Sequence, residues 1–238
     1  PTDLATRHLQ FHPPKSPAPS MASLPHLIIT FHLAVVVASA GSATVLAAST
    51  TGASAIGAAA STTAAVHDAD FVRLSCVATR YPTLCVQSLS RHAGAVGRDD
   101  RRLALAALYD SLSRARAARA YVARVSSKSS SRAVKDCAEQ MGNSVEWLGR
   151  ASKELSSMAG PSVRKNFPWH VSNVQTWVST AITDDTTCTD GLSVPRAAAV
   201  GGRVRADITH QVTHVARLTS NALALVNRFA QRRAGGHP

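Results

Sequence analysis

Residues 71–89 constrain the fold of this chain more than any other part of its sequence. They read FVRLSCVATRYPTLCVQSL, two short apolar segments that each carry a cysteine and that meet at Tyr81-Pro82. Proline cannot continue a helix, because its ring clashes with the preceding turn and it has no N–H group to donate. We therefore predict an α-hairpin with Cys76 on one arm and Cys85 on the other.

The chain contains four cysteines, and none of them stands in a CxxC pair. A zinc ribbon and a thioredoxin-like redox site are therefore both excluded. An even number of cysteines favours two disulfides, which require an oxidising compartment. Four cysteines allow three pairings, and the easiest joins Cys76 to Cys85 across the hairpin and Cys137 to Cys188 between neighbouring helices.

Four longer amphipathic helices are predicted after the hairpin. The first opens at Arg98-Asp99-Asp100, the second follows the serine-rich turn 126–131, the third follows Pro168, and the last spans about 203–229. Residues expected to face the core recur at steps of three and four, and include Leu105, Leu108, Val145, Leu148, Trp177, Val178, Ile182 and Leu225. No segment alternates as a strand would. Short connections make neighbouring helices antiparallel, so the predicted fold class is all-α, an up-and-down four-helix bundle with an N-terminal α-hairpin.

The first 67 residues do not have the pattern of a folded domain. Residues 1–20 are rich in proline and contain no methionine, so we interpret them as an upstream, non-native segment and Met21 as the start. Residues 21–40 hold an apolar run followed by Ala38-Ser39-Ala40, which is typical of a secretory signal peptide and its cleavage site. An organelle transit peptide is the alternative, because Asp3 is the only acidic residue before Asp68. Residues 41–67 have an Ala/Ser/Thr-rich linker composition, which leaves 68–235 as the folded domain.

The basic charge belongs to that domain. From Asp68 onward the chain has 24 Lys and Arg against 13 Asp and Glu, within a whole-chain net charge of +12. Such a field attracts nucleic acid, an anionic membrane or an acidic polysaccharide, and charge alone does not distinguish these partners.

Three motifs resemble the plant invertase and pectin methylesterase inhibitor family. They are FVRLSCVATRYPTLC, the Asp136-Cys137 pair, and WVSTAITDDTTCTDGL from Trp177 to Leu192. The form RYPTLCVQSLS of the hairpin is more similar to the pectin methylesterase inhibitor branch. The resemblance implies a secreted cell-wall protein that inhibits by stoichiometric binding over the active-site cleft of an enzyme. It implies no catalysis and no cofactor.

The resemblance also implies where the partner binds. Matched by position to the cysteines, the partner-binding residues are Glu139, Asn143, Glu146, Thr187 and Asp190. Asn143 stands at a position where an acidic residue would strengthen the match to the partner-binding positions of the family. Glu139, Asn143 and Glu146 are spaced i, i+4, i+7, which places them on one helix face away from the core. An ordinary solvated helix face is the alternative for the two glutamates, and local bonding to the backbone is the alternative for Thr187 and Asp190.

Other chemistry is poorly supported by the sequence. His210 and His214 stand at i, i+4, but HQVTH lacks the glutamate of HExxH and no third ligand is evident, so no metal site is expected. Asp184, Asp185 and Asp190 have no nucleophile elbow or phosphate loop nearby, so the chain is not expected to be an enzyme. The run RARAARAYVAR from Arg114 is expected to form a basic outer surface that adsorbs to wall polyanions.

The sequence therefore predicts an inhibitor of pectin methylesterase, secreted to the apoplast. A cell-wall or vacuolar invertase is the alternative target. A basic bundle that binds polysaccharide or membrane, with no enzyme target, is the alternative of another class.

Overall fold

The computed structural model describes residues 53–160, 165–194 and 200–235, with side chains from residue 63 onward. All of these residues belong to one compact unit, Thr50–Pro238. In chain order the helices are α1 (Ala53–Cys76), α2 (Pro82–Leu89), the 3₁₀-helix η1 (Ser90–His92), α3 (Ala93–Val96), α4 (Asp100–Ser126), α5 (Arg132–Ser157), α6 (Phe167–Ser193) and α7 (Gly202–Gly235). The described residues contain no strand, which confirms the all-α prediction. The predicted upstream segment and signal peptide, residues 1–40, lie outside the described residues.

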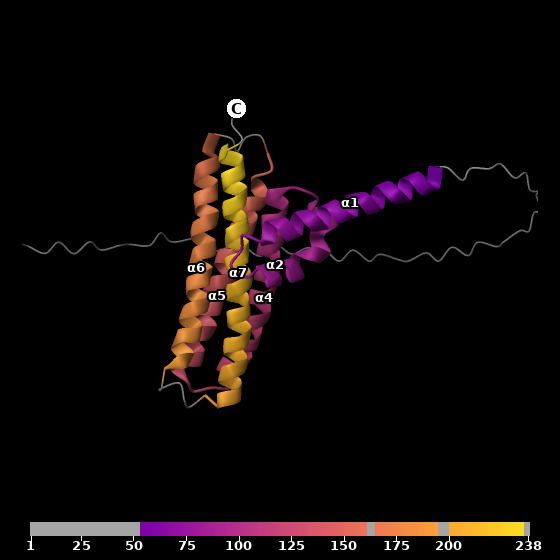
Figure 1. Ribbon diagram of the computed structural model, residues 1–238. Coiled ribbons are helices and arrows are strands. Elements are labelled where there is room, and N and C mark those ends of the chain that lie inside the picture. Colours follow the sequence, from indigo (N-terminus) through magenta and orange to yellow (C-terminus); the bar gives the residue numbers. More distant parts are fainter. Residues whose placement is uncertain (1–52, 161–164, 195–199, 236–238) are drawn as a thin grey trace, which may run out of the picture. The chain divides into compact units, whose positions relative to one another are not determined.

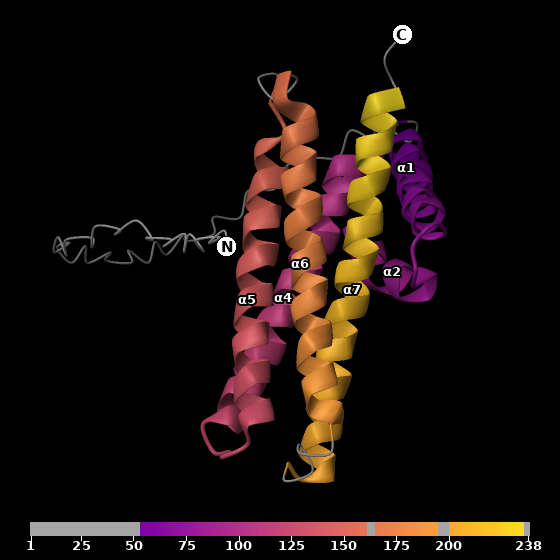
Figure 2. The same cartoon turned by 90° about the vertical axis from the view of Figure 1, so that its left-hand side faces the viewer.

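The four long helices form the predicted bundle (Figure 1). Helix α5 packs against α4 and α6, and α7 packs against the same two helices from the other side. The α5–α6 pair is therefore opposite the α4–α7 pair. The hairpin lies beside α4 and α7, on the side away from α5 (Figure 2).

The core follows the predicted periodicity in part, since four residues expected to face it are only partly buried: Leu105, Val145, Trp177 and Ile182. Leu108, Leu148, Val178 and Leu225 are fully or almost fully buried. Leu105, however, is only partly buried, whereas Leu103 is fully buried. The buried stripe of α4 is turned toward α7 and the hairpin because α2 covers that side of the helix, which the sequence of α4 alone does not reveal.

Local sequence explains where the helices begin and end. The Asp99 side chain caps α4 by accepting a hydrogen bond of 2.7 Å from the backbone N–H of Arg102. Gly97, with φ of +59°, makes the turn before that helix in a left-handed conformation that other residues rarely adopt. Helix α6 continues through Gly191 and ends at Ser193. A single glycine lowers helix stability by only about 1 kcal/mol, which tertiary packing outweighs.

The hairpin has a longer first arm than predicted. Helix α1 begins at Ala53, inside the range 41–67 that we expected to be linker. Alanine has the highest helix propensity of any residue, so an alanine-rich stretch continues a helix that a packed segment has already nucleated. Pro82 begins α2, as predicted for the second arm.

Both predicted disulfides are present. Cys76 pairs with Cys85 at a Cα–Cα distance of 5.6 Å, and Cys137 pairs with Cys188 at 4.3 Å. The described residues contain no free cysteine. Across sequence separations of 9 and 51 residues, the chain-entropy relation gives stabilisations of about 2.6 and about 4 kcal/mol.

A buried asparagine joins the hairpin to the bundle. The side chain of Asn221 on α7 accepts a hydrogen bond of 3.0 Å from the Tyr81 N–H and donates one of 2.9 Å to the Tyr81 carbonyl. Asn221 is only 2% exposed. One side chain therefore satisfies both backbone groups of the residue at the bend between the hairpin arms.

The core also contains a carboxyl group without a hydrogen-bond partner. Asp185 on α6 is fully buried, and neither of its carboxyl oxygens has a partner among the described residues. Burial raises the pKa of Asp185 to about 7; the Ser144 hydroxyl beside it opposes the rise, and the charge of Asp184 adds to it. The protonated form of Asp185 is therefore favoured in the folded protein.

We predict that Asn221→Ala loosens the hairpin. Leaving the Tyr81 N–H and carbonyl without partners costs about 1–3 kcal/mol, which lowers the Tm by several degrees in a domain of this size. Hydrogen exchange at the Tyr81 amide should become faster. The control is Asn227→Ala on the same helix, whose half-buried side chain accepts a 2.8 Å bond from Gln175. Equal losses of stability in the two variants would contradict a special role for Asn221.

We further predict that the stability of the protein falls as pH rises from about 4 to about 7. In this range Asp185 ionises in the unfolded chain but stays protonated in the folded one, since its pKa is raised from 3.8 to about 7. The unfolded state is thus favoured increasingly, by at most about 1.4 kcal/mol per pH unit. Denaturant titrations at several pH values measure this slope.

Asp185→Asn should reduce that slope, and Asp190→Asn, an exposed acid on the same helix, serves as its control. An unchanged slope in Asp185→Asn would show that another group causes the pH dependence.

Candidate functional site

The three predicted residues on α5 share its outward face. Glu139 and Glu146 are exposed, and Asn143 is half-buried between them. Glu146 forms an ion pair with Arg150 one turn further along the helix. The described residues place no cation within ion-pair distance of Glu139. The prediction of one polar face, away from the core, agrees with these positions.

The two predicted residues on α6 lie one turn apart but border different grooves. Thr187 is exposed and lines a groove between α5 and α6, and its hydroxyl donates a 2.8 Å hydrogen bond to the Thr183 carbonyl. Asp190 is exposed and borders a different groove, between α6 and α7. The five residues are thus a row on α5 with two separate positions on α6. The local backbone bond that was the alternative interpretation of Thr187 is present.

The groove between α5 and α6 was not predicted from the sequence. It has a volume of about 600 Å³ and runs beside the Cys137–Cys188 disulfide, whose cysteines are almost fully buried. Its other lining residues are Ser130, Ser131, Arg132, Ala133, Asp136, Gln140, Thr187, Gly191 and Val194. The helical period could have indicated part of this set. Ala133, Asp136 and Gln140 stand four residues before, one before and three after Cys137, so they share the side of α5 that faces α6.

The disulfide fixes the width of this groove. It joins the two helices at a Cα–Cα distance of 4.3 Å. Because Cα atoms lie about 2.3 Å from a helix axis, this corresponds to an axis separation of about 9 Å, within the usual range of about 8–10 Å for packed helices. Side chains of α5 and α6 that flank the groove are thus held in a constant relation to one another. Arg132 and Asp136 form an ion pair at 3.5 Å on its rim.

The carboxyl group whose pKa is raised to about 7 does not lie on this surface. Asp185, the carboxyl group with the raised pKa, is fully buried and out of reach of any substrate. In the parts of the chain that the structure describes, no group of three or more His, Cys, Asp and Glu side chains could hold a metal ion. None of the described helices is both long and apolar enough to cross a membrane.

Comparison with known proteins gives close relatives in plants. Pectinesterase inhibitor 9 of Arabidopsis thaliana is 44% identical over 175 residues, which cover 71% of this chain and 84% of the relative. The 21 kDa protein of Daucus carota is 36% identical over 167 residues, which cover 68% of this chain and 84% of that protein.

One solved structure has the same fold. It is a mutant form of a pectin methylesterase inhibitor from Arabidopsis, with a TM-score of 0.50 and 17% sequence identity. The alignment covers 64% of this chain and 92% of that one. At this identity the comparison supports the helical architecture alone.

The family model for the plant invertase/pectin methylesterase inhibitors matches residues 70–225, more than half of the chain. That description names inhibitors rather than catalysts, in agreement with the prediction that the chain is not an enzyme. The match spans the hairpin bend, both disulfides and most of the bundle. The chain therefore belongs to the plant invertase/pectin methylesterase inhibitor family.

Proposed function

We propose that this chain inhibits a pectin methylesterase by binding stoichiometrically over the active-site cleft of the enzyme. The observation that carries the proposal is its 44% identity with a relative named as a pectinesterase inhibitor, over most of the length of both proteins. The family description names invertase as well. An acid invertase is therefore the second candidate target.

The face formed by α5 and α6 is the surface that we propose for the enzyme. Helices of 26 and 27 residues rise about 40 Å, and two of them side by side are about 20 Å wide. This gives on the order of 800 Å², which a standard protein–protein interface buries on each partner.

The rigidity of this face supports the same proposal. Binding by a preordered surface loses less conformational entropy than binding by a mobile one. The disulfide between Cys137 and Cys188 supplies that order at the groove. Glu139, Asn143 and Glu146 present hydrogen-bond acceptors along one edge of it, while Thr187 and Asp190 stand on the neighbouring helix.

We also propose that the protein acts outside the cell, in the plant cell wall. Two disulfides are stable in an oxidising compartment, and residues 21–40 have the pattern of a secretory signal peptide. The target enzyme acts on wall pectin, so inhibitor and enzyme would meet there.

Mixing experiments test the target directly. We expect the protein to abolish the activity of a purified pectin methylesterase at a ratio near one to one, and to leave acid invertase active. Inhibition of invertase alone would identify acid invertase, the second candidate, as the target. Loss of neither activity, together with binding to polygalacturonate that disappears steeply with salt, would favour a basic polysaccharide-binding bundle without an enzyme target.

The binding face is tested by the double variant Glu139→Ala, Asp190→Ala. Neither side chain is buried, so the melting temperature should change little. We expect inhibition to weaken about tenfold or more, equivalent to about 1.4 kcal/mol of binding free energy. Asp207→Ala, an exposed acid on α7, is the control and should inhibit normally. Normal inhibition by the double variant would place the interface elsewhere on the protein.

A further inference from the structure

A second cavity lies on the opposite side of the bundle, between the hairpin and helices α4 and α7. It has a volume of about 210 Å³. Its lining residues are Leu84, Gln87, Ser88, Arg91, Asp110, Ser113, Arg114, His214 and Leu218. Most of these side chains can donate hydrogen bonds, and Asp110 is the one acid among them. The cavity also contains residues of two sequence motifs that the proposed function does not use, RARAARAYVAR and HQVTH.

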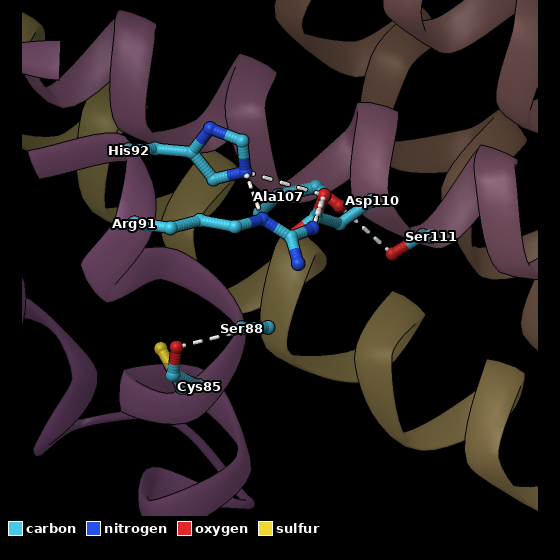
Figure 3. A network of polar contacts seen from close by, with 7 residues as sticks. All are labelled: Cys85, Ser88, Arg91, His92, Ala107, Asp110 and Ser111. Carbon is cyan, nitrogen blue, oxygen red and sulfur yellow. Dashed lines mark hydrogen bonds and ion pairs between the residues drawn. The ribbon is translucent and has the colours of Figure 1, made fainter. Parts of the chain in front are cut away.

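The single acid in this cavity is engaged through one of its two carboxyl oxygens, while the other, Oδ2 of Asp110, is buried without a hydrogen-bond partner among the described residues. Arg91 donates a hydrogen bond of 2.5 Å from Nη2 to Oδ1 of Asp110, and Nε2 of His92 lies 3.3 Å from the same oxygen (Figure 3). The side chain of Asp110 is only 12% exposed. Arg91 thus compensates the charge of Asp110, and the other cations around the cavity have no such partner.

Those other cations are Arg114 on α4 and Arg217 on α7. No acidic side chain among the described residues lies within ion-pair distance of either one. The Arg217 guanidinium lies 5.6 Å from the ring centre of Tyr81, and that of Arg80 lies 5.7 Å from the same centre. The hairpin bend therefore holds two guanidinium groups close to one aromatic ring.

The pKa of His214 indicates the sign of the electrostatic potential around its side chain. Its pKa is lowered by burial first, and then by the positive charges of Arg114, His210 and Arg217. The other charged groups that line the cavity are Arg91 and Asp110, which neutralise each other. Burial is the larger cause of the lowered pKa of His214, and the contribution of Arg114 and Arg217 to it indicates an excess of positive potential at this site.

We propose that this cavity, with Arg114 and His214 on its wall and Arg217 beside it, binds a carboxylate of a uronic-acid chain such as oligogalacturonate. Carboxylates pair with guanidinium groups through charge-assisted hydrogen bonds. The hydroxyl of Ser113 and the amide of Gln87 provide further partners of the kind that a sugar requires, and the Ser88 hydroxyl, which already donates a 3.1 Å hydrogen bond to the Cys85 carbonyl, can still accept one. The cavity is smaller than the roughly 300–1,000 Å³ of pockets that enclose a drug-sized ligand, so it accepts one unit of a chain rather than a whole oligomer.

The choice of uronic acid rests on the proposed function, because hydrolysis of a methyl-esterified uronate leaves a free carboxylate on the polymer. The cavity is opposite the α5–α6 face, so the enzyme and the polymer would bind at the same time. The inhibitor would then be retained on pectin that has already been de-esterified.

Nuclear magnetic resonance titration of the full chain tests this site. The His214 signal is assigned by comparison with His214→Ala, and trigalacturonic acid is the probe. We expect saturable binding that raises the pKa of His214, since a bound carboxylate offsets Arg114 and Arg217. Maltotriose, a neutral sugar, should have no effect, and sulfate at the same ionic strength should have less effect than the uronate. An equal response to sulfate, or no response of His214 to trigalacturonic acid, would overturn the proposal.

Arg114→Gln should weaken trigalacturonic acid binding at least threefold. It should also raise the pKa of His214 in the free protein, because one of the charges that lowers it is gone. Arg116→Gln is the matched control: it removes an exposed arginine from the same helix, but one that does not line the cavity. Equal weakening in the two variants would show an effect of net charge alone and overturn the site.

These measurements contain no enzyme, so they are independent of the inhibition assay. Arg114→Gln should inhibit pectin methylesterase normally, because Arg114 lies outside the α5–α6 face. Failure of inhibition with retained uronate binding would remove the proposed function and keep the site. The reverse result would remove the site alone.

Discussion

The covalent tie between α5 and α6 is the constraint on which the proposed binding surface depends. It joins the two helices at a Cα–Cα distance of 4.3 Å and closes a loop of about fifty residues, which is worth about 4 kcal/mol in the chain-entropy relation. The groove beside it and the polar row on α5 keep their relative positions because of this tie. A second, non-covalent tie does the same for the hairpin, where Asn221 holds both backbone groups of Tyr81. The hairpin also has its own disulfide, between Cys76 and Cys85.

The two surfaces differ in electrostatic character. The α5–α6 face carries charges of both signs, in which Arg132 pairs with Asp136 and Arg150 with Glu146, while Glu139 has no cation within ion-pair distance among the described residues. The hairpin side presents cations whose one acidic neighbour is already paired. A net charge of +12 conceals this division, since it is a sum over the whole chain. Under the two proposals above, the first face would bind an enzyme and the second a polyanion.

Asp185 is a titratable group in the core, so its protonation depends on the pH of the solution. A fully buried carboxyl with no hydrogen-bond partner among the described residues is costly when ionised, so burial raises its pKa. Its place on α6, one turn before Cys188, puts this group beside the disulfide that shapes the groove. We therefore expect this carboxyl to favour the folded state more in acidic solution, in which it keeps its proton.

The sequence by itself determined the helical class, the bend at Pro82, the N-terminal cap of α4 and the outward row of Glu139, Asn143 and Glu146. These features depend on the helical period and on the chemistry of near neighbours, which a sequence displays directly. Tertiary structure alone decided that Asp185 is buried while Asp190 is exposed, that Leu103 rather than Leu105 faces the core, and that Asn221 reaches Tyr81. It also decided that Arg114 and His214, a hundred residues apart, line one cavity. The reason is that each of these positions depends on which side of a helix its neighbours cover, and those neighbours come from distant parts of the chain.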